Sequence, residues 1–118
     1  SCINSGLLIN VDFFLKIGGY NSNLFLDFCD HDFIEKSKLN QVDQFGIINC
    51  KLEQDFSAIN HTKDQALDRY ELFLEDLAQF YKGRNKITVF FFVDLPRVVR
   101  LILKYKTIKP LIKRIKIW

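Results

Sequence analysis

The sequence contains no methionine, no Cys-x-x-Cys pair, no internal repeat and no low-complexity linker. No segment reaches the roughly 20 apolar residues of a membrane-spanning helix, and no signal peptide is visible, so neither insertion nor export is supported. The first motif begins within five residues of Ser1, and we therefore expect the chain to be a piece of a longer protein.

Cysteine is scarce and irregularly placed. Cys2, Cys29 and Cys50 are odd in number, so neither a disulfide framework nor a zinc site is indicated. A reducing, cytosolic setting fits this pattern. The 48% of hydrophobic residues in 118 residues is ample for the core of one globular domain.

Acidic residues are missing from the end of the chain. From Arg97 to Trp118 there are eight Lys or Arg residues and no Asp or Glu. Residues 1–60 carry a net charge of −4, whereas residues 61–118 carry +7. This asymmetry is typical of a surface that is attracted to phosphates.

The first half of the chain reads as α/β. Ser5–Val11 is apolar enough to be a buried strand, and Asp12 can cap a short helix over Phe13–Ile17. Asp30–Lys38 reads as a helix, and Phe45–Leu52 reads as one or two short strands.

The second half predicts helices. Thr62 and Gln65 have capping-box spacing, Gly83 is a plausible stop, and the apolar residues between them recur at helical spacing: Leu67, Tyr70, Phe73, Leu74, Leu77 and Tyr81. Ile87–Val93 fits a strand by propensity or a helix by continuation, and we favour the helix. Leu95–Lys106 and Ile108–Ile117 read as two amphipathic helices. We therefore divide the chain into residues 1–60, 61–93 and a basic tail, 94–118.

Three carboxylates, Asp27, Asp30 and Asp32, follow a Gly-Gly turn at short intervals. Closely spaced carboxylates raise one another's pKa and oppose folding unless something compensates, so this spacing suggests a carboxylate held for use. The alternative is a helix N-terminus whose dipole favours acidic residues in the first turn.

Several motifs, in order, resemble the acceptor-side half of the family-two inverting glycosyltransferases, and most closely their bacterial rhamnosyltransferase-like branch. They cover roughly residues 5 to 85: Ser5-Gly6-Leu7-Leu8-Ile9, Phe13, Ile17-Gly18-Gly19-Tyr20, Leu24-Phe25-Leu26-Asp27, Asp30-His31-Asp32-Phe33 and Tyr81-Lys82-Gly83-Arg84-Asn85. The resemblance implies an α/β fold, namely the C-terminal portion of a GT-A nucleotide-sugar transferase domain with few strands. A long helix and basic amphipathic helices would follow, and the donor half would precede this chain.

The resemblance also implies roles for single residues. Asp30 matches the catalytic base that takes the proton of the acceptor hydroxyl. The residues implied to bind substrate are Asp32, Ser5, Gly6, Gly19 and Arg84. The alternative for Asp32 is a helix cap, and the alternative for Ser5 and Gly6 is a turn at the edge of a strand. For Arg84 the alternatives are a pyrophosphate contact and a structural tie at the end of the long helix. Lys36 stands where the family usually has arginine, and a surface ion pair with Asp32 is the simpler interpretation.

One departure concerns the metal. Family members commonly have a histidine that completes a divalent site, and here Gln54 occupies its place. Magnesium or manganese therefore stays possible but doubtful as a cofactor of the full-length protein, unless His61 or Asp55 substitutes. No metal-ligating residue is assigned.

Two functions follow. The first is a glycosyltransferase fragment, inactive alone, that transfers a sugar with inversion from a nucleotide-sugar donor to a glycan or lipid-linked acceptor in cell-surface polysaccharide synthesis. The alternative is a noncatalytic, membrane-peripheral interaction module. In both, residues 95–118 would bind an anionic membrane, at the inner face of the plasma membrane. Nucleic acid is not expected as a partner, because aromatic residues do not alternate with the charges.

Overall fold

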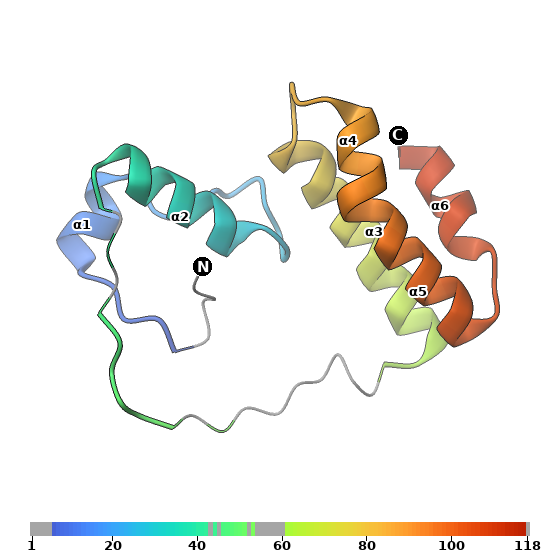
Figure 1. Ribbon diagram of the computed structural model, residues 1–118, viewed down its shortest axis with the longest axis horizontal. Coiled ribbons are helices and arrows are strands. Elements are labelled where there is room, and N and C mark those ends of the chain that lie inside the picture. The colour runs from blue at the N-terminus through green and yellow to red at the C-terminus, as the bar shows by residue number, and fades with distance from the viewer. Residues whose placement is uncertain (1–5, 43, 45, 52, 54–60, 118) are drawn as a thin grey trace. The chain divides into compact units, whose positions relative to one another are not determined.

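Helices make up all the regular secondary structure in the part of the chain that the structure describes (Figure 1). The structure is a computed structural model, and it describes residues 6–42, 44, 46–51, 53 and 61–117. The chain separates into two units, Ser1–Asp55 and Phe56–Trp118.

The predicted α/β class and the GT-A portion with few strands are wrong for the described residues, which contain no strand. The apolar runs at 6–10 and 46–51 are irregular, and Leu8 and Ile47 are 78% and 97% exposed. A strand is stable only when neighbouring strands pair with its backbone and cover its side chains, so β-propensity alone does not produce one.

The first unit contains two helices, α1 (Val11–Lys16) and α2 (Cys29–Leu39). The helix α1 begins two residues earlier than predicted, because its N-cap is Asn10, whose side chain accepts the backbone N–H of Phe13 at 2.9 Å. Asp12 is therefore a first-turn residue and not the cap.

An aromatic cluster joins the two helices of this unit. The ring of Phe14 lies 5.2 Å from that of Tyr20 and 5.7 Å from that of Phe33, which belongs to α2. Phe33, Leu24 and Ile34 are buried, whereas Tyr20 is 40% exposed. Burial of these side chains fixes the Gly-Gly turn against α2, where the acidic residues lie.

The second unit begins with the long helix α3 (Lys63–Phe80), which confirms the prediction for this segment. The capping box forms: Thr62 N–H donates to Gln65 Oε1 at 2.9 Å, and Gln65 N–H donates to Thr62 Oγ1 at 3.4 Å. Five of the six residues predicted for the core face are buried: Leu67, Tyr70, Phe73, Leu74 and Leu77. The sixth, Tyr81, is the C-cap and is only half-buried.

A second long helical stretch follows a turn at Gly83. It consists of α4 (Lys86–Val89), the π-helical turn η2 (Phe90–Asp94) and α5 (Leu95–Tyr105), which run into one another without a break. The helical interpretation of Ile87–Val93 is thus confirmed. The last helix, α6 (Lys109–Ile117), packs against both α3 and α5 (Figure 1).

Asp94 ties these helices together. It is completely buried at the end of η2, where its carboxylate accepts the Tyr70 hydroxyl of α3 at 2.7 Å and the Arg114 Nε of α6. Burial and the hydrogen bond to Asp94 raise the pKa of Tyr70, so the phenol stays protonated and donates. A charge buried this deeply is tolerated because it is paired.

Candidate functional site

The acidic residues lie on the first turn of α2. Phe28, in the left-handed region at φ 65°, precedes the helix and provides no side-chain cap. Asp30 and Asp32 occupy the positions that follow, where the helix dipole favours negative charge. Asp30 is half-buried, and its Oδ1 accepts the backbone N–H of His31 at 2.9 Å.

Lys36 connects Asp32 to the glycine turn. Its Nζ lies 2.9 Å from Asp32 Oδ2 and donates to the Gly19 carbonyl at 3.1 Å. The predicted i, i+4 ion pair therefore forms, and Lys36 also takes part in a tertiary contact that the spacing did not reveal. The two carboxylates are thus unequal, because Asp32 is fixed by a cation.

Tyr20 is a candidate site residue that the sequence analysis missed. Partial burial raises the pKa of its phenol, and the charges of Cys29 and Asp30 raise it further. The ring packs on Phe14 and Phe33. Its position beside the glycine pair was the available signal, but only the fold of α2 onto the turn brings it to the acidic residues.

The glycines have different surroundings. Gly19 is buried at φ +60°, and a Cβ there would lie 3.0 Å from the Phe14 ring. The backbone conformation and the packing against Phe14 therefore explain why this residue is a glycine. Gly6 is exposed at φ 78°. Ser5 lies outside the described residues. The structure thus gathers Gly19, Asp30 and Asp32 in one region.

Arg84 belongs to the second unit and has its own contacts there. Its guanidinium lies 5.6 Å from the ring centre of Phe80 and 5.3 Å from that of Tyr81. These contacts hold the guanidinium on two rings at the end of α3, which is a different tie from the predicted one to a carboxylate of the site. The side chain remains exposed, so the contact with substrate stays a prediction.

A divalent cation needs several oxygen or nitrogen ligands that converge on one point. Across 6–42, 44, 46–51, 53 and 61–117, no three His, Cys, Asp or Glu side chains gather in this way. Gln54 and Asp55 lie outside the described residues, and the carbonyl of His61 accepts the Tyr105 hydroxyl at 3.0 Å. The described donor set does not fit a metal, so a metal requirement stays a prediction.

Comparisons with protein families, with curated proteins and with solved structures found no match to this chain. The glycosyltransferase resemblance therefore rests on the motifs themselves.

The basic tail forms the helices predicted for it, but its cations fall into two groups. Arg97 lies 3.9 Å from the ring centre of Phe73, Lys113 pairs with Asp68 and Glu71, and Arg114 pairs with Asp94. The exposed cations are Arg100, Lys104, Lys106, Lys109 and Lys116. No described helix is long and apolar enough to cross a bilayer.

Proposed function

We propose that this chain supplies the acceptor-side part of an inverting glycosyltransferase, which transfers a sugar from a nucleotide-sugar donor to a glycan or lipid-linked acceptor. The observation that carries the proposal is the position of Asp30 on the first turn of α2, next to a second carboxylate that Lys36 holds. The proposal rests on this motif and its order in the chain, not on a GT-A architecture.

The chemistry assigns the two carboxylates different tasks. Inversion requires a base on the acceptor side, which removes the hydroxyl proton as the oxygen attacks the anomeric carbon and the nucleotide leaves. Asp30 is the better base because Asp32 is held by Lys36 at 2.9 Å. The protonated Tyr20 phenol, whose pKa is raised, can donate a hydrogen bond to the incoming acceptor.

The test is the substitution Asp30→Asn, made in the longer protein that contains both this chain and the donor-binding part. Transfer from a panel of radiolabelled nucleotide-sugars should fall by about 10²–10⁴-fold, the usual contribution of a general base. Asp12→Asn, an exposed first-turn carboxylate of α1, is the matched control. Helical circular dichroism should be unchanged in both. If Asp30→Asn transferred sugar at a rate within about threefold of the parent, Asp30 would not be the catalytic base.

A second candidate, a membrane-peripheral module, is favoured by the exposed surface of α5 and α6. Apolar side chains are exposed there among the five exposed cations: Val99, Leu103, Ile108, Leu111, Ile112 and Ile115. Helices with apolar and basic faces bind the interface of anionic bilayers. Each basic residue near such a surface contributes roughly 1 kcal/mol, so five can hold the chain there at low salt. Location at the inner face of the plasma membrane belongs to this proposal.

Co-sedimentation with liposomes tests this candidate. The chain should bind anionic but not neutral vesicles and should dissociate at high salt. The double variant Leu103→Glu/Ile115→Glu, at positions 72% and 78% exposed, should lose binding without unfolding. Leu39→Glu, at a position 84% exposed on α2, is the control and should bind like the parent. A membrane role for this surface would be refuted if the control variant lost as much vesicle binding as the double variant, or if the double variant still bound.

A further inference from the structure

The helical stretch from Lys86 to Tyr105 carries a row of exposed side chains that the core of the second unit does not use. Phe92, Pro96, Val99 and Leu103 are all exposed, and the phenylalanine and the leucine are 80% and 72% exposed. Their spacings of four, three and four residues place them on one face of a helix. These four residues form an apolar stripe, and contiguous exposed apolar surface is typical of a contact with a partner.

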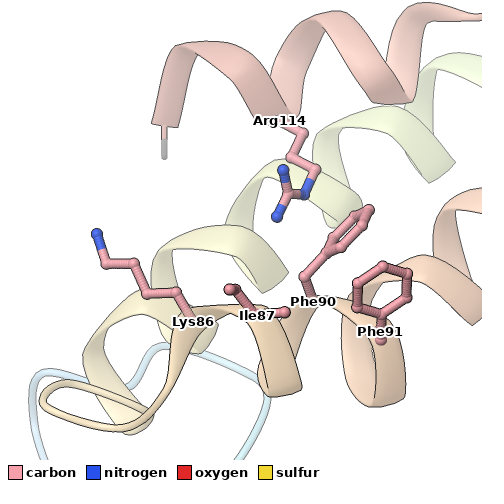
Figure 2. Close-up of a pocket in the computed structure, with 5 residues that line it drawn as sticks. All are labelled: Lys86, Ile87, Phe90, Phe91 and Arg114. Atoms are coloured by element: carbon pink, nitrogen blue, oxygen red, sulfur yellow. The ribbon is translucent and has the colours of Figure 1, made fainter.

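The π turn η2 brings two aromatic rings, Phe91 and Phe92, to the start of the apolar stripe. Figure 2 shows Phe90 turned toward Arg114, whose guanidinium carbon lies 4.1 Å from the ring centre, while Phe91 lies to one side of both. Phe91 is 55% exposed, and with Ile87 it borders a shallow hollow that adds to the apolar surface. Turns of this kind occur frequently at functional sites.

Positive charge runs along one side of the apolar stripe. Arg100 and Lys104 are exposed, lie four residues apart, and each directly follows a residue of the stripe in the sequence. Asp94 is the only acidic residue between Lys86 and the end of the chain, and it is completely buried. The stems of the two cations can therefore lie beside the apolar residues while their charges reach lipid head groups, with no carboxylate of this stretch opposing them.

This charge pattern also decides between two occupants that would cover the apolar stripe. If two copies of the chain paired through their stripes, Arg100 and Lys104 of both copies would meet in one interface and repel one another. An anionic bilayer attracts the same cations, and phenylalanine rings enter the boundary between its head groups and acyl chains. The charges therefore favour a bilayer over a second copy.

We propose that the apolar stripe lies along an anionic bilayer and that the rings of Phe91 and Phe92 anchor it by inserting at the acyl-chain boundary. The proposal rests on the membrane-peripheral function above, and it adds the π turn, which the surface of α5 and α6 did not include. Vesicle binding by the parent chain tests that function, whereas the depth of residue 92 tests the anchor. The two can therefore fail separately.

Tryptophan fluorescence measures this depth. In the full chain with Trp118→Phe, the substitution Phe92→Trp places the single tryptophan in the apolar stripe, and Gln79→Trp places it at an exposed position of α3 as the control. The probe is a phosphatidylglycerol vesicle with brominated acyl chains, which quench a tryptophan that reaches them. The emission of Phe92→Trp should shift to the blue and be quenched, and that of Gln79→Trp should stay as it is in solution.

The outcomes separate the anchor from the function on which it rests. If Phe92→Trp co-sediments with the vesicles but is quenched no more than Gln79→Trp, the rings do not insert and the proposal is overturned. If the parent chain does not co-sediment at all, the membrane-peripheral function is refuted, and the anchor with it.

A polar substitution gives a second measurement. Phe92→Ser should weaken binding to these vesicles by about fivefold or more, because the ring no longer leaves water, and Leu39→Ser on α2 should change it by less than about twofold. Helical circular dichroism should be retained in both. An equal effect of the two substitutions would overturn the proposal. So would a parent chain that forms dimers without lipid and a Phe92→Ser variant that does not, because the stripe would then bind a second copy.

Discussion

Gly19 illustrates how a single residue can be constrained in two ways. Its backbone has φ +60°, which residues with a Cβ adopt only with strain. A Cβ would also lie 3.0 Å from the Phe14 ring. Gly18, its neighbour, has φ +82° but open space around it. The first glycine thus serves the turn, and the second serves both the turn and the packing of the aromatic cluster.

We therefore predict that Gly19→Ala destabilises the first unit more than Gly18→Ala. Backbone strain alone should cost about 1–2 kcal/mol in Gly18→Ala. In Gly19→Ala, overpacking against Phe14 should add a further ~1–3 kcal/mol. Hydrogen exchange of the α2 amides measures this because it reports local opening. Equal protection in the two variants would argue against the packing constraint.

Part of the candidate site was predictable at this scale and part was not. Asp30 and Asp32 are visible in the sequence because charged residues so close together are conspicuous. Tyr20 and the hydrogen bond from Lys36 to Gly19 were not predictable, because the partners of each are distant in the chain. Only the packing of α2 on the turn brings them together.

Among the elements, the stretch from α4 to α5 departs most from regular periodicity. Its buried residues Val89, Asp94 and Val98 are spaced by five and then four positions, so a stripe with a period of 3.6 does not include them all. A buried aspartate within an apolar segment gives no recognisable pattern in advance. The sequence therefore predicted a helix here but not its π turn.

Two neighbouring cations of α6, Lys113 and Arg114, provide a prediction for this element. Arg114→Leu leaves the fully buried Asp94 without its ion pair, and it should destabilise the second unit by about 3–5 kcal/mol. Lys113→Leu, one position away, should cost less than about 1 kcal/mol, because its partners Asp68 and Glu71 are 77% and 47% exposed.

Urea unfolding of the two variants, followed by helical circular dichroism, measures the difference. Tyr70→Phe serves as an intermediate case, since it removes only the 2.7 Å hydrogen bond to Asp94 and should cost about 1–3 kcal/mol. Similar losses for Arg114→Leu and Lys113→Leu would mean that Asp94 does not depend on its ion pair.

At the scale of the whole molecule, the two units have cores of different size. The second unit buries side chains from α3, α4 and α5, whereas the first buries chiefly Leu24, Phe33 and Ile34. Small cores give marginal stability, because the ordering entropy grows with every residue. We infer that the second unit is the more stable of the two.

Residues 56–118, produced alone, should therefore fold into helices and unfold cooperatively with urea. Residues 1–55, produced alone, should show weak helical circular dichroism and little cooperativity. The parent chain is the reference for both pieces. A second unit that is unfolded in isolation would mean that its core depends on residues 1–55.

The architecture as a whole was the least predictable level. Capping and periodicity predicted α3 correctly, because those signals act within one helix. The strands expected near Leu8 and Ile47 did not form, because a strand depends on pairing partners that local propensity does not supply. The α/β class was wrong for this reason.

The π turn η2 corresponds to one residue more than an ordinary α-helix would have here, and in the gene that residue is one additional codon. Val89 and Asp94 are five residues apart, and loss of a codon for Phe91 or Phe92 would leave them four apart, a spacing that an ordinary α-helix keeps on one face. The buried ties of Asp94 to Tyr70 and Arg114 would then survive in a shorter helix with one exposed ring fewer. An in-frame deletion at this point would thus remove the π turn and keep Val89 and Asp94 on one face of the helix.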